Sequence, residues 1–265
     1  MGVVAGITAA AVAALVLLFS VSQGLHTPES AQCYRGKIYV SNIGNLPPDK
    51  KDGDGYISLI SREGKVLKAK FITGLNAPKG ITFCNGKLFV ADIDRVVVAE
   101  PETGKVLKEI TVEGARFLND TACKDDKTVF VSDTQTNTIY SIDANTYGVK
   151  VYIKSHKLQG PNGLAVAPDG KLLVASWGGG KLMKVDGGVE TLATGFENLD
   201  GVVVAPDGTV FFSDFSAGKI YAYSKGKVAE VAAGLTSPAD IGYCEGEILV
   251  PEFLMNDVKV LKVKK

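Results

Sequence analysis

Residues 161–175 read PNGLAVAPDGKLLVA, and residues 199–213 repeat the pattern as LDGVVVAPDGTVFFS. Each copy places two short apolar runs on either side of a Pro-Asp-Gly turn. Proline presets φ at the first turn position, and glycine adopts the positive φ that a tight hairpin needs. Each copy is therefore expected to form a β-hairpin. Its variable polar residue is Asn162 in the first copy and Asp200 in the second.

The hairpin pattern occurs six times along the chain. Gapless alignment on the variable position gives the equivalent residues, here called the anchor residues: Glu29, Lys79, Asn119, Asn162, Asp200 and Ala239. Successive anchor residues are 38 to 50 positions apart, and further apolar runs follow the hairpins. A repeat of about forty residues with four strands has the size of a propeller blade. The Gly-His and Trp-Asp signatures of WD40 repeats are missing, so we predict an all-β, six-bladed β-propeller of another type.

The sixth repeat is incomplete at the C-terminus. After Ala239 the chain has 26 residues, enough for the hairpin and a third strand. The fourth strand is expected from the other end of the chain, because residues 24–28 repeat the Gly-Leu-x-x-Pro pattern of residues 74–78 and 234–238. We therefore predict that residues 19–23 form the outer strand of the last blade. This strand would close the ring and remove an open sheet edge.

The first 25 residues contain no charged side chain, and residues 6–19 are nearly all Ala, Val, Ile and Leu. This pattern is typical of a secretory signal peptide or a membrane anchor, with a buried core helix as the alternative. We predict a short apolar helix over residues 3–18. Sixteen residues at about 1.5 Å each fall short of a bilayer core of about 30 Å. The predicted domains are residues 1–18, a signal peptide or an anchor at the membrane surface, and residues 19–265, the propeller.

Composition narrows the class of function. Hydrophobic residues make up 46% of the chain, which is enough for a complete core. Lys plus Arg and Asp plus Glu number 29 each, so no basic face for nucleic acid is predicted. The two histidines argue against a His-rich zinc site and a Ser-His-Asp triad. We expect an exported monomer, periplasmic or extracellular, that acts on a small molecule and touches a membrane only through its N-terminal segment.

The four cysteines fall at two neighbouring repeat positions. Cys33 and Cys123 occupy one position, and Cys84 and Cys244 occupy the next. Residues at the same position belong to blades one and three, or two and six, which are not neighbours. A disulfide needs Cα atoms within about 7 Å. We therefore predict four buried, unpaired thiols that act as small hydrophobic groups.

An insertion of ten residues lengthens the first repeat, within residues 46–57. This Asp-rich stretch is similar to an EF-hand loop. Placing Gly55 at the invariant glycine, however, puts Lys50 at the first ligand position and Ser61 at the twelfth, where Asp and Glu are needed. We therefore expect a solvated insertion on the channel face rather than a calcium loop.

The first strand of each blade lines the central channel of a propeller, so the anchor residues are expected to converge at one level. The carboxylates Glu29 and Asp200 and the amides Asn119 and Asn162 are the oxygen donors that a hard cation prefers. We predict that these four residues bind a divalent cation, with Ca²⁺ as the first choice and Mg²⁺, Mn²⁺ or Zn²⁺ as alternatives. The plainer alternative is that the polar side chains only solvate a wet channel.

Lys79 is the cationic member of the anchor residues. One role for Lys79 is to balance the neighbouring carboxylates. The other role is to hold a substrate carboxylate or a developing oxyanion. Because of this second role, we predict Lys79 as a substrate-binding residue.

Four segments resemble the SMP-30/gluconolactonase/LRE-like family, relatives of the paraoxonases, and the resemblance covers roughly residues 19–265. The segments are Pro28-Glu29, Arg116-Phe117-Leu118-Asn119-Asp120, Pro161-Asn162-Gly163-Leu164 and Leu199-Asp200-Gly201. The resemblance implies that Glu29, Asn162 and Asp200 bind a divalent metal with Asn119 beside it. It also implies lactone hydrolysis with Asp200 as the base. Family members have Asn directly after Arg-Phe, whereas Leu118 intervenes here, and Arg116 is the implied substrate contact.

Two functions are consistent with these residues. The first is a metal-dependent hydrolase of lactones or related esters, in which the cation polarises the carbonyl and Asp200 accepts a proton from the attacking water. The second is a non-catalytic propeller with a structural metal that binds a ligand or a protein on its loop face. Both remain open at this point because one fold serves many functions.

Overall fold

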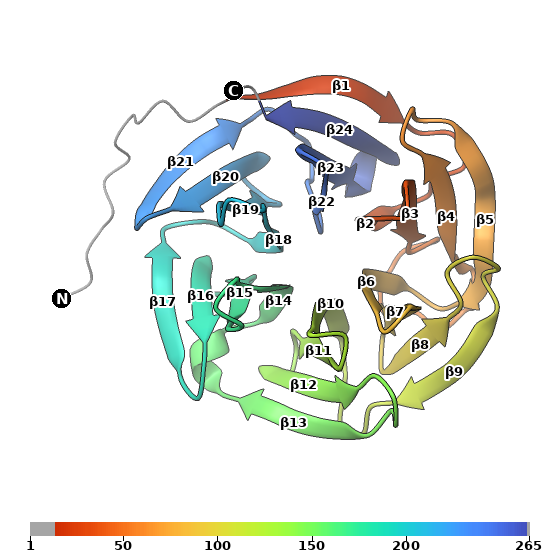
Figure 1. Cartoon of the computed structure of the whole chain (residues 1–265), viewed down its shortest axis with the longest axis horizontal. Coiled ribbons are helices and arrows are strands. Elements are labelled where there is room, and N and C mark those ends of the chain that lie inside the picture. Colours follow the sequence, from red (N-terminus) through yellow and green to blue (C-terminus); the bar gives the residue numbers. More distant parts are fainter. Residues whose placement is uncertain (1–13, 264–265) are drawn as a thin grey trace.

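The computed structural model describes residues 14–263, which form six four-stranded antiparallel sheets around a central channel (Figure 1). The six-bladed β-propeller predicted from the repeats is confirmed. In blades one to five the strands follow one another in sequence order from the channel outward. Residues 14–263 contain no α-helix, and their two short 3₁₀ helices are η1 (His156–Leu158) and η2 (Phe253–Met255).

Blade one contains β2 (Pro28–Tyr34), β3 (Lys37–Asn42), β4 (Gly55–Ser61) and β5 (Val66–Leu75). Blade two contains β6 (Pro78–Cys84), β7 (Lys87–Asp92), β8 (Arg95–Ala99) and β9 (Val106–Thr111). Blade three contains β10 (Leu118–Lys124), β11 (Thr128–Asp133), β12 (Thr138–Asp143) and β13 (Val149–Lys154). Blade four contains β14 (Pro161–Val166), β15 (Leu172–Ser176), β16 (Lys181–Val185) and β17 (Val189–Thr194). Blade five contains β18 (Leu199–Val204), β19 (Val210–Asp214), β20 (Lys219–Ser224) and β21 (Lys227–Ala232). Blade six contains β22 (Gly242–Cys244), β23 (Glu247–Glu252), β24 (Asp257–Val263) and β1 (Leu15–Val21).

The sixth blade contains strands from both ends of the chain. β1 pairs antiparallel with β24, with Leu15 opposite Val263 and Val21 opposite Val258, and it forms the outer strand of this blade (Figure 1). The strand begins at Leu15 rather than at the predicted residue 19. Pairing satisfies the backbone groups that β24 would otherwise expose as an open edge.

The predicted helix over residues 3–18 is wrong from Leu15 onward, because Leu15–Leu18 belong to β1. The predicted domain boundary after residue 18 therefore falls inside a strand. The rest of the predicted signal peptide or anchor, residues 1–13, lies outside the described residues. Within the described part of the chain, no helix has the length and apolar character to cross a membrane.

A β-bulge lies at the anchor residue in each of the first five blades. In blade five, for example, Leu199 pairs with Asp214 and Val202 with Phe212, so the two intervening residues have no pairing partner. A bulge bends the strand locally and re-aims its side chains. Asp200 lies inside this bulge, and its side chain reaches the channel while the strand pairs regularly beyond it.

Buried aspartates at the end of the second strand hold the loop that leads into the inner strand. Asp92, Asp133 and Asp214 each accept hydrogen bonds from two successive backbone N–H groups. The donors are Asn76 and Ala77, Arg116 and Phe117, and Glu197 and Asn198, at 2.8–3.3 Å. Hydrogen bonding makes these buried carboxylates tolerable. Each of them fixes the start of an inner strand and hence the position of its anchor residue.

The hydrophobic core lies between neighbouring blades. One cluster joins Tyr39 of blade one to Val90 of blade two, and another joins Phe89 of blade two to Tyr140 of blade three. Burial of one such large apolar side chain contributes roughly 1.5–3 kcal/mol. These interfaces hold the blades together and so position the anchor residues relative to one another.

All four cysteines are paired, which contradicts the prediction of free thiols. Cys33 of blade one is bonded to Cys244 of blade six, and Cys84 of blade two to Cys123 of blade three. The Cα atoms of each pair are 5.5 Å apart. The prediction compared cysteines at the same repeat position, whereas the bonds join adjacent positions on neighbouring blades, where the inner strands approach closely.

Candidate functional site

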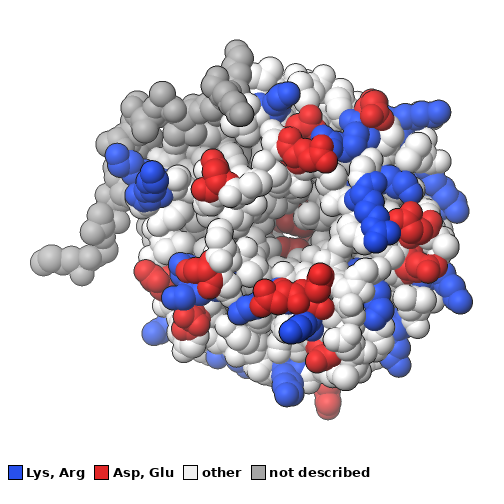
Figure 2. All heavy atoms as spheres, viewed as in Figure 1, with Lys and Arg blue, Asp and Glu red and all other residues white. Residues whose placement is uncertain are grey.

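Five of the six anchor residues line one cavity of about 450 Å³ in the central channel. They are Glu29, Lys79, Asn119, Asn162 and Asp200. The sixth, Ala239, is buried and offers no donor group. Figure 2 shows acidic atoms deep in the central opening. The structure therefore brings together the four predicted metal ligands and the predicted substrate-binding lysine.

Each of the four predicted metal ligands has a buried side-chain oxygen that lacks a hydrogen-bond partner within residues 14–263. These atoms are Glu29 Oε2, Asn119 Oδ1, Asn162 Oδ1 and Asp200 Oδ1. A buried polar atom without a partner costs about 1–3 kcal/mol, so such atoms are uncommon in native proteins. A divalent cation would offer such oxygens a partner, and the donor set is of the kind that Ca²⁺ takes.

Thr134 determines the orientation of the Asn119 amide. The Thr134 hydroxyl donates to the carbonyl of Pro161 at 2.9 Å, so towards Asn119 it can only accept. Asn119 Nδ2 is the donor in that contact, at 3.3 Å. The amide oxygen of Asn119 is consequently the atom left without a partner.

The acidic anchor residues resist ionisation in the absence of a counter-charge. Burial raises the pKa of Glu29 well above its ordinary value, with further increases from the charges of Asp200 and Asp240 and a decrease from Lys79. Burial also raises the pKa of Asp200, as does Asp240, while a hydrogen bond from the Asn162 side chain opposes the rise. A cation held between the two carboxylates would favour their ionised forms.

Two further buried carboxylates, Asp120 and Asp240, belong to the same part of the channel, although neither is among the predicted site residues. Burial raises the pKa of both, that of Asp240 to about 7. Asp120 accepts backbone N–H bonds from Leu164 at 2.5 Å and Thr121 at 2.6 Å. Asp240 Oδ2 accepts from Ser30 Oγ at 2.5 Å.

A signal for these two residues was present in the repeats. Asp120 and Asp240 each follow an anchor residue, at a position where the other repeats have Ser or Gly. A Cβ on Gly80 would lie 2.2 Å from Asp120 Oδ1, and a Cβ on Gly201 would lie 2.8 Å from Asp240 Oδ1. Glycine in the preceding blade therefore provides the room for each aspartate.

Lys79 is held by the insertion of blade one. Its Nζ donates to the carbonyls of Pro48 at 2.8 Å and Ala77 at 3.0 Å, and lies 4.4 Å from the centre of the Phe117 ring. Burial lowers the pKa of Lys79 to about 8, while Glu29 opposes the decrease. Pro48 itself lines the cavity, so the insertion forms part of its wall.

Arg116 does not line the cavity. Its side chain is exposed, and its backbone N–H donates to Asp133. The implied substrate contact is therefore absent from this site, because Leu118 starts the inner strand and Arg116 stays in the preceding loop. His26 and His156 are also exposed and lie outside the cavity lining.

Apolar side chains from the loops form the remaining wall of the cavity. We call Phe117, Trp177, Phe215 and Phe253 the aromatic collar. The ring centres of Trp177 and Phe215 are 5.3 Å apart, and those of Phe215 and Phe253 are 5.8 Å apart. Ile43 and Pro48 complete the apolar lining, with Thr134 and Gln135 as its polar members.

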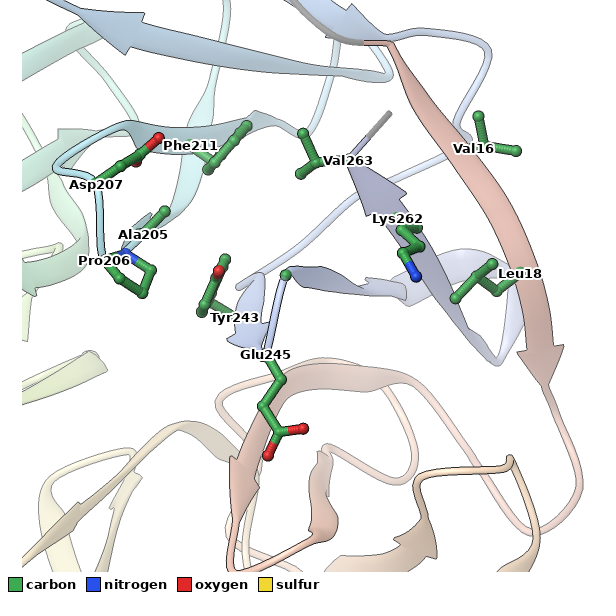
Figure 3. A pocket seen from close by; sticks show the side chains of 11 residues that line it. Val16, Leu18, Ala205, Pro206, Asp207, Phe211, Tyr243, Glu245, Lys262 and Val263 are labelled. Carbon is green, nitrogen blue, oxygen red and sulfur yellow. The ribbon is translucent and has the colours of Figure 1, made fainter. Parts of the chain in front are cut away.

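A larger cavity, of about 990 Å³, lies between blade five and blade six, and its lining includes residues of β1, the outer strand of blade six (Figure 3). Most of its lining is apolar, including Val16, Phe211 and Val263. Its lining includes none of the anchor residues. The buried oxygens without partners and the shifted carboxyl pKa values lie in the channel, so we place the candidate site there despite its smaller volume.

The sequence matches no protein-family model and no curated protein. Among solved structures, the chain is similar to a streptogramin B lyase (TM-score 0.69, 15% identity, 94% of this chain and 97% of that chain). It is similar to a catalytically inactive virginiamycin B lyase from Staphylococcus aureus, with a histidine replaced by alanine and quinupristin present (TM-score 0.66, 15% identity, 94% and 98%). It is also similar to a structural genomics protein of unknown function from Bacteroides thetaiotaomicron (TM-score 0.72, 16% identity, 94% and 72%). These neighbours are six-bladed β-propellers, and the likeness is one of fold.

Proposed function

We propose that the channel holds a divalent cation through Glu29, Asn119, Asn162 and Asp200, and that the protein hydrolyses a lactone or a related ester. The observation that supports this most directly is the group of four buried oxygens without partners, all from one set of equivalent repeat positions. Ca²⁺ suits these hard oxygen ligands best, with Mg²⁺, Mn²⁺ or Zn²⁺ as alternatives.

The charge balance of the channel supports a cation. Four carboxyl groups, those of Glu29, Asp120, Asp200 and Asp240, are buried there with the single ammonium group of Lys79. Their ionised forms repel one another at close range. A divalent cation would offset that repulsion at the position of the anchor residues.

When bound, the cation would supply a Lewis acid that polarises the substrate carbonyl. Asp200 is the proposed general base, because its side chain lines the cavity and, with Oδ1 on the cation, its other carboxylate oxygen would be left for the water. It would take a proton from the water that attacks the carbonyl, and the ester bond would open to a carboxylic acid and an alcohol. Asn162 of the neighbouring blade would help to keep Asp200 ionised, because its side chain opposes the rise in the pKa of Asp200.

Two further points favour a carboxylate base. The resemblance to the SMP-30/gluconolactonase/LRE-like family assigns this role to the residue at position 200. The inactive virginiamycin B lyase variant lacks a histidine, whereas neither histidine of this chain lines the cavity. We therefore do not assign that lyase's chemistry to this site.

The proposed setting is an oxidising compartment. Two disulfides are typical of exported proteins, and we propose a periplasmic or extracellular location with membrane contact only through the N-terminal segment. The substrate would be a small molecule, and a monomer would suffice because one chain supplies all the anchor residues.

The metal site is tested by calorimetric titration of chelator-treated protein with each of the four cations. The reaction is tested by measuring hydrolysis of a panel of lactones and esters with and without chelator. Hydrolysis that chelator abolishes and added cation restores would support the proposal. Cation binding without turnover of any ester would favour the alternative, a binding propeller with a structural metal. Absence of cation binding would overturn both.

A further inference from the structure

We propose that the aromatic collar selects substrates with a single oxygenated head group and an apolar body, and rejects polyhydroxylated lactones. This inference rests on the proposed function, because it names the substrate class for the same cavity. It concerns residues that the repeat pattern did not identify and that bind no metal.

The polar groups of the cavity are confined to one region. The anchor residues supply oxygen and nitrogen atoms, whereas Ile43, Pro48 and the aromatic collar supply carbon surface. Of the two polar wall residues, Thr134 already uses its hydroxyl to bind Asn119 and Pro161. Gln135 and the indole N–H of Trp177 remain as the two wall groups that can bind a ligand hydroxyl.

This distribution favours one kind of ligand. The carbonyl end of a lactone can reach the anchor residues, and the rest of the molecule then contacts apolar surface. Each additional hydroxyl group would lose its water without gaining a partner, which lowers affinity. An alkyl or aryl group in the same place gains affinity from burial.

Three rings of the aromatic collar, those of Trp177, Phe215 and Phe253, form a continuous row, and the fourth ring, Phe117, lies against Lys79. The members of the collar come from the loops of four successive blades, three to six, and consecutive rings from Trp177 to Phe253 are in contact. All four side chains are half-buried. Exposed apolar surface that converges on a few polar groups is typical of small-molecule sites, and a volume of about 450 Å³ lies within their usual range.

Trp177 provides a direct test, because it is the sole tryptophan of the chain and lines the cavity. The probes are alkyl-substituted cyclopentanones with tails of one to six carbons, which keep the ring carbonyl but are not opened by water. A polyhydroxylated cyclohexanone is the polar comparison. The titrations use Trp177 fluorescence with the full protein in the presence of Ca²⁺.

We expect the dissociation constant to fall by about fourfold per added methylene until the cavity is filled, with no saturable binding of the polyhydroxylated probe. Phe215→Leu and Phe253→Leu should reduce the gain per methylene. Leu254→Ala is the matched control, since Leu254 is an exposed neighbour of Phe253 outside the cavity lining.

The outcomes separate this inference from the proposed reaction. Three results would each overturn the selection of apolar substrates, even if esters are hydrolysed. They are equal affinity for short and long tails, tight binding of the polyhydroxylated probe, and an unchanged gain in affinity per methylene in both phenylalanine variants. Tail-dependent binding without turnover of any lactone or ester would uphold the selection by the collar and overturn the hydrolase proposal instead.

Discussion

Ser30 Oγ of blade one donates a hydrogen bond to Asp240 Oδ2 of blade six at 2.5 Å, inside the channel. The same two blades are joined near their inner strands by the disulfide between Cys33 and Cys244. The junction at which the ring closes therefore has a polar contact and a covalent one, and Asp240 links this junction to the charges of the candidate metal site.

Stability of the cation-free protein should fall as pH rises. Burial raises the pKa of Asp240 to about 7, whereas its pKa in the unfolded chain is about 3.9. Between these values the folded protein holds a proton that the unfolded chain has lost, so the free energy of unfolding decreases from about pH 4 to about pH 7, by at most about 4 kcal/mol for this group. Thermal unfolding in chelator should give a lower midpoint at pH 8 than at pH 5.

The variant Asp240→Asn should remove part of this slope, because the amide does not titrate. Glu29 and Asp200 have raised pKa values as well and should preserve the remainder. A midpoint that rises between pH 5 and pH 8 in chelator would contradict the assignment of these carboxyls as protonated in the cation-free protein.

Asp200→Asn should lower ester hydrolysis by about 10²-fold or more, because it removes the proposed base and one ligand charge. Glu29→Gln should mainly weaken cation binding, so excess cation should restore part of its rate. Initial rates measured across a cation titration separate the two effects. Wild-type turnover by the Asp200 variant at saturating cation would remove Asp200 from the mechanism.

Thr134→Val should weaken cation binding by about tenfold or more, in line with other residues that orient metal ligands. Valine keeps the shape of threonine but cannot accept from Asn119, so the amide is free to turn its oxygen away. Thr136→Val is the matched control, since its hydroxyl has no hydrogen-bond partner within the described structure and lies outside the cavity lining. Equal affinity in the two variants, measured by calorimetry, would show that Thr134 does not position Asn119.

Replacement of Cys33 and Cys244 by serine should lower the free energy of unfolding by about 2–5 kcal/mol. The corresponding change at Cys84 and Cys123 should cost about 1.5 kcal/mol less in the loop-entropy model, because that bond spans 39 residues rather than 211. Urea unfolding of both double variants measures the difference. Detection of free thiols in denatured, unreduced wild-type protein would contradict the pairing itself.

Local chemistry made the blade hairpins predictable. The Pro-Asp-Gly turns need positive φ at glycine, and Gly170 and Gly208 adopt φ of 76° and 84°. Blades one, two and six have Arg-Gly, Asn-Gly and Glu-Gly at the corresponding turn, and the apolar strands on either side keep their spacing, so the alignment also located the anchor residues. The convergence of Glu29 and Asp200 in one cavity followed from the ring geometry of the fold.

Contacts between distant parts of the chain could not be predicted in the same way. The apolar run Leu15–Leu18 suits a helix or a strand, and the edge of β24 determines that it is a strand. The cysteine pairs depend on which positions of neighbouring blades face each other. Trp177 and Phe215 occupy equivalent positions, one residue after the second strand of blades four and five. The equivalent residue of blade three is Thr134, so the repeat alignment alone did not mark this position as an aromatic cavity wall.

The bulged inner strands make the site modular in an evolutionary sense. Blades one to five each contribute one anchor side chain to the cavity from their own inner strand, and the hydrogen bonds that hold that strand come from the backbone and from residues such as Asp214. A single codon change can therefore exchange one anchor side chain without altering the scaffold around the others. Ala239 is the position in the ring where a further donor can be gained in this way, so descendants of one propeller can differ in the donor groups that their channels present.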